Sequence, residues 1–296
     1  MRRLFAGILP GLIPAIIILA GAGCGGGSGQ LAQDASTSVD TYVALDLASG
    51  KVVPLGSDRT AAEADPANRT SRILFRRIPA GRGTIGCPGN LSQPSERDPQ
   101  EIAYDEFFCA VYETTQAQWA LLSGTTPWSS SLFDAAFTDK SKAVDPLMPA
   151  WGMTCQQAID AAASWSHSGW RVDLPSSTEW EIACRAGMAI NLFPWGNLTD
   201  PALARNRAVF WELTTPDPLP QQVGKHSANA WGLHDFIGNV WEFAIPGEQT
   251  GSAVELRGGA YDQPLIVCRA SNKMVHPRGL ATTVAGVRLV LRRTGN

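Results

Sequence analysis

The chain has 296 residues, of which 44% are apolar and 17% charged, and its 24 basic and 27 acidic residues leave a formal net charge of −3. This balance is typical of a globular protein with a full hydrophobic core. The 29 glycines, 20 prolines and 10 tryptophans indicate a loop-rich fold rather than a helical bundle or a coiled coil. The acidic balance and the lack of a basic stripe argue against nucleic acid as a partner, because lysine and arginine must neutralise its phosphates.

The first 24 residues have the pattern of a signal peptide. Two arginines precede an apolar run at residues 4–20, and small residues lead up to Cys24. The end of this segment resembles a bacterial lipobox, in which the cysteine is acylated and becomes the new N-terminus, although Gly21 stands where leucine is usual. We predict an exported protein that is lipid-anchored to the membrane of the bacterial cell envelope through Cys24. Plain secretion and an uncleaved membrane anchor are the alternatives.

Residues 25–72 read as a linker. Its first residues are glycine-rich and would form a flexible tether. A short hairpin is predicted for residues 42–47 and 51–55, around the sequence Ala-Ser-Gly. We expect one compact domain over residues 73–296, ending in a strand whose alternation places Val287, Leu289 and Leu291 on one face.

Three helices have clear boundary signals. The first starts after Thr114 or Thr115 and stops at Gly124. The second starts after Thr154, with Gln157 completing a capping box. Ser176 and Glu179 form the same box before the third helix, which Gly187 ends. Between residues 190 and 286 we expect short strands and long irregular loops instead of helices.

Cysteine and histidine spacing offers no metal motif. In an exported protein, cysteines are more often structural than metal-binding. The cysteines after Cys24 are Cys87, Cys109, Cys155, Cys184 and Cys268. Their odd number leaves at least one thiol unpaired, and the four histidines lie too far apart in the sequence to predict a histidine metal site.

The stretch GLHDFIGNVWE, residues 232–242, carries an unusual set of oxygen ligands. Asp235 and Glu242 offer carboxylates, and the backbone freedom of Gly238 could turn its own carbonyl and that of Val240 toward the same point. A hard cation such as calcium prefers six to eight oxygen ligands. The alternative is a Gly-Asn turn in which Asp235 caps the backbone and Glu242 pairs with an arginine.

Several motifs in order resemble the formylglycine-generating enzyme family, also called sulfatase-modifying factors. They are YETTQAQWALLSG, LPSSTEWEIACRAG, FPWGN, GLHDFIGNVWEF, LRGGAY and AGVRLV, and the resemblance covers about residues 73–292. It implies one α+β domain of the C-type-lectin-like type, poor in regular structure and often stabilised by calcium.

The resemblance also implies two calcium sites. One corresponds to the side chains of Asp235 and Glu242 with the carbonyls of Gly238 and Val240. The other corresponds to Asn206 and the carbonyl of Arg207, but its later ligands belong to a loop that is shortened here, where only Asp217 could substitute.

The family's chemistry requires a pair of cysteines that bind Cu(I) and activate O₂, so that a substrate cysteine becomes formylglycine. Counting without gaps from Tyr261 places Gln263 at the first of these positions and Cys268 at the second, and Ala260 replaces the family's serine. An amide is a poor ligand for this soft ion. Cys268 is therefore the only candidate catalytic thiol.

Cys268 has a second interpretation through the resemblance. The sequence CRAS at residues 268–271 is similar to the segment around a later structural cysteine of the family, which is bonded to the cysteine that corresponds to Cys184. We prefer this disulfide, Cys184–Cys268, because it needs no missing partner. A second pair between Cys87 and Cys109 is also open.

Two functions of different class follow. The chain could be a non-catalytic relative that binds a protein, peptide or glycan at the cell surface, which we favour, or an oxidase that generates formylglycine with copper. A metal-dependent enzyme with histidine ligands is a third possibility. The ligand groove that we predict is lined by Trp241, Tyr261, Asp262, Gln263, Arg269, Asn272 and His276.

Overall fold

The computed structural model describes residues 40–89, 96–165, 169–188, 190–212, 218–247 and 251–294. All of them belong to the unit that spans Val39–Asn296. The predicted signal peptide and Cys24 lie outside the described residues. Within the described ranges, no helix combines the length and the apolar character needed to cross a membrane.

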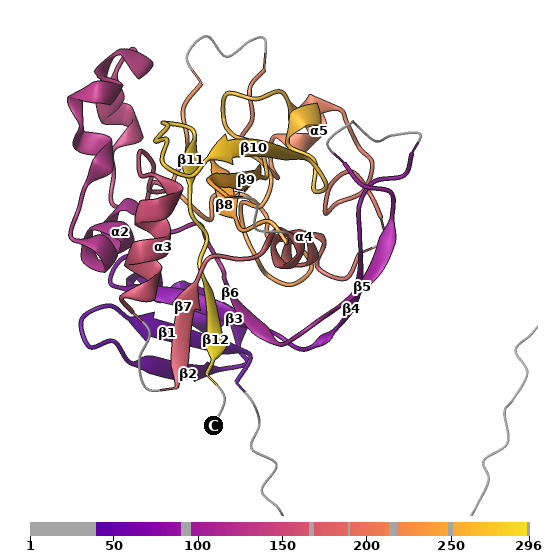
Figure 1. The fold of residues 1–296 in the computed structure, drawn as a ribbon, viewed down its shortest axis with the longest axis horizontal. Helices are drawn as coiled ribbons and strands as arrows, with labels where there is room; N and C mark the ends of the chain where they lie inside the picture. The colour runs from indigo at the N-terminus through magenta and orange to yellow at the C-terminus, as the bar shows by residue number, and fades with distance from the viewer. Residues whose placement is uncertain are drawn as a thin grey trace, which may run out of the picture. The chain divides into compact units, whose positions relative to one another are not determined.

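A six-stranded sheet with the strand order β2-β1-β3-β6-β12-β7 forms the base of the unit (Figure 1). All of its pairs are antiparallel. Its strands are β1 (Tyr42–Asp46), β2 (Val52–Gly56), β3 (Arg72–Ile78), β6 (Phe107–Ala110), β7 (Trp170–Asp173) and β12 (Val290–Arg293).

The predicted hairpin is present as β1 and β2, but it is not part of a linker. Strand β1 pairs with β3 over five residues, and its side chains are buried almost throughout. The domain boundary predicted at residue 73 is therefore too late. The sequence from 42 to 72 looks polar on average, yet its few apolar residues complete the sheet, which local composition does not show.

Helices cover the two faces of this sheet. One core cluster joins alternate sheet residues such as Val43, Leu45 and Phe75 to the buried faces of α2 (Gln116–Ser123) and α3 (Cys155–Ala163). A second cluster joins Leu74 and Phe107 to α4 (Ser177–Arg185). Figure 1 shows α2 and α3 together, with α4 apart from them.

The predicted starts of the three helices are confirmed. Thr115, Thr154 and Ser176 are the N-caps, and each closes a capping box with the glutamine or glutamate three residues later. Gly124 ends α2 in the left-handed conformation. For α4 the left-handed C-cap is Ala186, one residue before the expected Gly187.

The rest of the unit is loop-rich, as predicted. A four-stranded sheet has the order β10-β9-β8-β11, and β4 and β5 form a separate pair. These strands are β4 (Gly81–Ile85), β5 (Gln100–Tyr104), β8 (Trp241–Ala244), β9 (Ala253–Arg257), β10 (Lys273–Pro277) and β11 (Ala285–Gly286). The short helices are α1 (Arg59–Ala64), α5 (Pro201–Ala204), η1 (Pro66–Arg69), η2 (Pro127–Ser129), η3 (Ser131–Ala136), η4 (Lys140–Ala143) and η5 (Leu265–Val267).

The C-terminal segment links the two larger sheets. Its first part, β11, pairs with β8 in the four-stranded sheet, and its second part, β12, lies between β6 and β7. The predicted alternation holds, because Val287, Leu289 and Leu291 pack in one core cluster and Val290 packs in the other. Arg288 is completely buried and contacts both the six-stranded and the four-stranded sheet.

Candidate functional site

The Gly-Asn pair inside GLHDFIGNVWE joins three segments of the chain. Gly238 and Asn239 both have left-handed backbones, with φ of 76° and 60°. A Cβ on Gly238 would lie 1.8 Å from the carbonyl oxygen of Val209, so only glycine fits. The Gly238 amide donates to Gly258 O and the Asn239 amide to Val209 O, both at 2.8 Å. The pair thus bridges neighbouring segments and is not a hairpin turn.

The buried side chain of Asn239 holds a loop against this motif. Its Oδ1 accepts a hydrogen bond from the Gln221 amide at 2.8 Å, and its Nδ2 donates to Gln221 O at 3.2 Å. The same Nδ2 donates to Glu113 Oε2 at 2.6 Å. Val209 and Gln221 are thus both hydrogen-bonded to Asn239. The amide of Tyr261 donates to Asn239 O, so Tyr261 lies beside the described parts of the segment between residues 209 and 221.

The segment ends in a fully buried ion pair. Arg288 Nε lies 3.0 Å from each carboxylate oxygen of Glu242, and Nη2 lies 2.7 Å from Oε1. Trp180 Nε1 also donates to this carboxylate, at 2.5 Å. Asp235 accepts from the Gly224 amide at 2.6 Å. The arginine-paired alternative for Glu242 is thus the one present.

This arrangement does not fit a calcium ion at Asp235, Gly238, Val240 and Glu242. Arg288 already supplies the positive charge that Glu242 needs, and a divalent cation beside a buried guanidinium would be repelled. Among the described residues, no group of three or more histidine, cysteine, aspartate or glutamate side chains is placed to hold a metal ion.

The other predicted calcium site, at Asn206 and the carbonyl of Arg207, stays a prediction. Asn206 is exposed, and its carbonyl accepts a hydrogen bond from Ser227 at 3.4 Å. The guanidinium of Arg207 lies 5.9 Å from the ring of Trp195. Asp217 lies outside the described residues.

Glu113 joins Asp235 and Glu242 in one buried group of carboxylates. Burial raises the pKa of Glu113 well above its ordinary value, and the nearby charges of Asp235 and Glu242 raise it further. Burial also raises the pKa of Asp235 and of Glu242, although Gly224 and Arg288 oppose the effect by hydrogen bonding and charge. Nothing in the sequence around Glu113 indicated this role, because its partners lie more than 100 residues away.

Cys268 is a buried thiol that forms no disulfide with another described cysteine. Burial raises its pKa to about 12, so it is protonated at neutral pH. Its Sγ lies 3.7 Å from Pro264 O and 4.0 Å from both Ala260 O and Gln263 O. The side-chain amide of Gln263 donates to Asp262 at 3.1 Å. One protonated thiol and a backbone of hard oxygens do not fit Cu(I).

The preferred disulfide is not formed in the structure. Cys184 and Cys268 are both free buried thiols, as are Cys87 and Cys109, the other pair left open. Cys268 packs so closely on Gly259 that a Cβ there would lie 2.3 Å from its sulfur. The sulfur of Cys268 is thus directed at the LRGG backbone, which the sequence similarity alone did not indicate.

The seven predicted groove residues do not share one surface. Trp241, Arg269 and His276 are buried: Trp241 in the core beside β9, Arg269 in an ion pair with Glu96 at 3.0 Å, and His276 with Nε2 2.9 Å from Leu280 O. Asp262, Gln263 and Asn272 are partly exposed. Tyr261 is the one of the seven that lines a pocket described below, formed by residues of the described ranges.

That pocket, the Tyr261 pocket, has a volume of about 370 Å³. Its walls include Arg205, Phe210, Glu212, Leu219, His226 and Tyr261. Arg205 and Glu212 form an ion pair at 2.5 Å, and hydrogen bonds from Arg205 lower the pKa of Glu212. Sequence reasoning missed all of these residues except Tyr261, although the charged ends of RNRAVFWEL, residues 205–213, flank an apolar centre.

The chain is similar in sequence to one protein family and to proteins of known name. A profile of the sulfatase-modifying factor enzyme 1-like domain matches residues 60–293. The chain is 24% identical over 279 residues to the bovine formylglycine-generating enzyme, covering 76% of this chain and 68% of that protein. A shorter match, 36% identical over 88 residues, relates it to bovine inactive C-alpha-formylglycine-generating enzyme 2, covering 26% of this chain and 28% of that protein.

The fold is shared with a solved structure. PvdO from Pseudomonas aeruginosa superposes with a TM-score of 0.63 at 22% sequence identity, covering 74% of this chain and 94% of that one. At this identity the likeness concerns the fold, and it agrees with the predicted α+β architecture.

Proposed function

Because the chain belongs to the sulfatase-modifying factor enzyme 1-like domain family, we propose that it is an exported member of that family which binds a protein, peptide or glycan and does not oxidise one. Its relatives include proteins named as enzymes and proteins named as inactive. The choice between these classes therefore depends on the residues of this chain.

The protonated thiol of Cys268 carries the proposal. Copper chemistry of the family's kind needs two thiolates, and Gln263 stands where the first would be. Burial keeps Cys268 protonated and enclosed by backbone, so a substrate thiol has no path to it. The alternative, a formylglycine-generating oxidase, would require the loop at residues 262–268 to rearrange.

The Tyr261 pocket supports a binding role. At about 370 Å³ it is within the range of pockets that hold small ligands or single side chains, roughly 300 to 1,000 Å³. Apolar walls from Phe210 and Leu219 stand beside the Arg205–Glu212 ion pair and His226. Such a mixture suits a peptide side chain or a sugar ring, each of which has an apolar face and polar edges.

The first experiment separates binding from catalysis. The full-length chain would be loaded with Cu(I) and incubated with O₂ and a Cys-x-Pro-x-Arg peptide, beside an active formylglycine-generating enzyme as positive control. We expect the peptide mass to stay unchanged with this chain. Conversion to the aldehyde that disappears in Cys268→Ser would instead establish the oxidase.

The second experiment tests the pocket. The chain would be screened on a glycan array and against a displayed peptide library, and hits would be retested with Leu219→Arg, which places a charge in the pocket. Leu132→Arg is the matched control, because Leu132 is 86% exposed and is not among the residues lining the pocket. Loss of binding with Leu219→Arg alone supports the proposal, and hits that bind both variants equally contradict it.

Export and anchoring are part of the same proposal. The test is metabolic labelling of a bacterial host with radioactive palmitate, comparing the wild-type chain with Cys24→Ala. Label on the wild type alone supports a lipid anchor at Cys24. An unlabelled wild-type chain in the culture medium would support plain secretion.

A further inference from the structure

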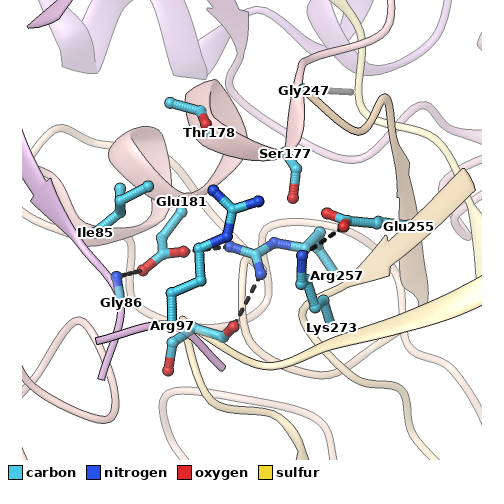
Figure 2. A pocket seen from close by; sticks show the side chains of 11 residues that line it. Ile85, Gly86, Arg97, Ser177, Thr178, Glu181, Gly247, Glu255, Arg257 and Lys273 are labelled. Carbon is cyan, nitrogen blue, oxygen red and sulfur yellow. Dashed lines mark hydrogen bonds and ion pairs between the residues drawn. The ribbon is translucent and has the colours of Figure 1, made fainter. Parts of the chain in front are cut away.

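A second, smaller pocket lies at the start of α4, between β9, β10, the end of β4 and the segment before β5 (Figure 2). Among its lining residues are Arg97, Ser177, Thr178, Glu255, Arg257 and Lys273. Neither the Tyr261 pocket nor the buried ion pair of Arg288 shares these residues. We call it the α4 pocket.

Arg257 is a buried cationic residue in the lining of the α4 pocket. It is 1% exposed, and Figure 2 shows its guanidinium in the middle of the site. Its Nη2 pairs with Glu181 at 2.5 Å, and its Nη1 donates to Ser271 O at 2.9 Å. Its Nε has no hydrogen-bond partner among the described residues. A buried N–H of a charged group without an acceptor is costly, so an acceptor atom at this position would be stabilised.

Arg97 adds a second, uncommitted guanidinium. Its backbone is held in place by the amide of Cys87, which donates to Arg97 O at 2.8 Å. Its side chain is exposed, lines the pocket and makes no ion pair with any described residue. Arg97 is therefore free to engage a ligand without losing a contact that supports the fold.

The acidic residues at the site are already neutralised. Glu181 is shared between Arg257 and Arg185, at 2.5 and 2.8 Å, and also accepts from the Gly86 amide. Glu255 pairs with Lys273 at 2.5 Å through Oε1, and its Oε2 has no hydrogen-bond partner among the described residues. Burial opposes the charge of Glu255, but hydrogen bonds from Lys273 and Ser177 hold its pKa below the ordinary value. Among the described lining residues, three basic side chains face two acidic ones, so the charge of this lining is net positive.

The N-terminus of helix α4 also adds positive electrostatic potential to the pocket. Ser177 and Thr178 are the first two residues of this nine-residue helix, whose N-terminus carries the positive end of the helix dipole. Figure 2 shows both side chains on the rim of the pocket, across from Lys273. The lining thus comes from a helix, from strands and from the segment before β5.

The volume limits what could enter. The pocket measures about 50 Å³. One water molecule needs roughly 10 to 15 Å³, and a pocket for a drug-sized ligand has roughly 300 Å³ or more. A group of a few heavy atoms fits, and a sugar ring or an aromatic side chain does not.

From this geometry we propose that the α4 pocket binds a tetrahedral oxyanion group, a sulfate or a phosphate, between Arg97, the Nε of Arg257 and the start of α4. Guanidinium groups pair with such oxygens in forked geometry, and the Thr178 hydroxyl at the helix N-terminus is a further donor, whereas Ser177 donates to Glu255. The group is either the free ion or the charged end of an ester whose remainder stays outside the pocket.

The test is isothermal titration calorimetry of the full-length chain with four probes: sodium sulfate, sodium phosphate, glucose 6-sulfate and glucose 6-phosphate. Sodium chloride at the same ionic strength corrects for general screening. We expect saturable binding of at least one probe with a dissociation constant of about 1 mM or lower. Ions that bind without their esters indicate a site for the free ion, and esters that bind more tightly indicate the charged end of a larger ligand.

Two variants make the assignment specific. Arg97→Glu should weaken the binding by about tenfold or more, because it replaces a charge-assisted donor with a like charge. Lys51→Glu is the matched control, since Lys51 is exposed on the distant edge near β2 and changes the net charge equally. The proposal is overturned if the wild type binds none of the four probes, if sodium chloride competes equally, or if both variants bind alike.

Discussion

Arg288 and Glu242 form an ion pair that is entirely removed from solvent, with side-chain exposures of 0% and 1%. Arg288 also donates to Ala110 O in the six-stranded sheet and to His234 O in the GLHDFIGNVWE segment. One guanidinium therefore connects the base sheet, the motif and β8. Its other face lies 4.0 Å from the ring centroid of Phe236.

The first prediction concerns this connection. Arg288→Met should lower the free energy of unfolding by about 3 to 5 kcal/mol, because it leaves the Glu242 carboxylate buried without a positively charged partner. Arg82→Met is the control, since Arg82 pairs with Glu101 on the surface at exposures of 64% and 58%, and should change stability by less than about 1 kcal/mol. Urea unfolding measures both, and similar losses would contradict the prediction.

The second prediction concerns calcium. With Arg288 beside Glu242, we expect the melting temperature of the EDTA-treated chain to be the same with and without millimolar calcium. Magnesium at equal ionic strength is the control. A melting temperature that rises with calcium concentration, as linkage requires for a ligand of the folded state, would restore the calcium site predicted from the sequence.

The third prediction concerns pH. The folded chain keeps a proton on Glu113 at pH values where the unfolded chain has lost it, because the folded pKa is raised. This group thus contributes its full stability below the ordinary glutamate pKa of about 4.3, and the contribution falls as pH rises toward the folded pKa, by about 1.4 kcal/mol per unit. Glu113→Gln should remove this component and flatten the decline in stability above about pH 4.3.

Urea unfolding at several pH values tests this decline in the wild type and in Glu113→Gln. Glu101→Gln is the control, because Glu101 is fully exposed and its pKa is lowered by Arg82, so it titrates below this range. The expectation fails if the difference in stability between the wild type and Glu113→Gln does not depend on pH.

The fourth prediction concerns the thiols. In denaturant without a reductant, a Cys24→Ala variant should release five reactive thiols, one for each cysteine that is free in the structure. The native protein should react slowly at neutral pH, because burial keeps Cys268 and Cys155 protonated, with pKa values of about 12. A count of three in denaturant would show a disulfide, and peptide mapping would show whether it joins Cys184 to Cys268.

The fifth prediction concerns Gly238. Its alanine variant needs a left-handed backbone and places a methyl group 1.8 Å from Val209 O, so Gly238→Ala should cost more than about 2 kcal/mol of unfolding free energy. Gly279→Ala is the control, because nothing lies within 4 Å of a Cβ there. If thermal unfolding shows equal effects, the close packing of residue 238 on Val209 is not what holds the motif.

Local signals in the sequence determined the helices and the family. Thr115, Thr154 and Ser176 each cap a helix through hydrogen bonds with a residue three positions later. The start of each helix can therefore be predicted from residues that are close in the sequence. The alternation of Val287 to Leu291 was likewise visible in the sequence, although residues 287–289 connect β11 to β12 and only the last two of the five residues lie in a strand. The absence of a cysteine at Gln263 was visible in the same way and argued against copper before any geometry was known.

Contacts between distant segments decided the place of β1 in the main sheet and the partners of the buried charged residues. Strand β1 belongs to the main sheet because β3 pairs with it, and the average composition of residues 25–72 does not carry that information. The sequence offered both calcium and an arginine as partners of Glu242, and only the folded chain brings Arg288, 46 residues away, onto its carboxylate. The ion pair of Arg269 with Glu96 also forms only because two distant segments meet in the fold, and the same holds for the surroundings of Arg257 Nε. The groups that pack against a charged side chain decide its interactions, and these groups come from other parts of the chain.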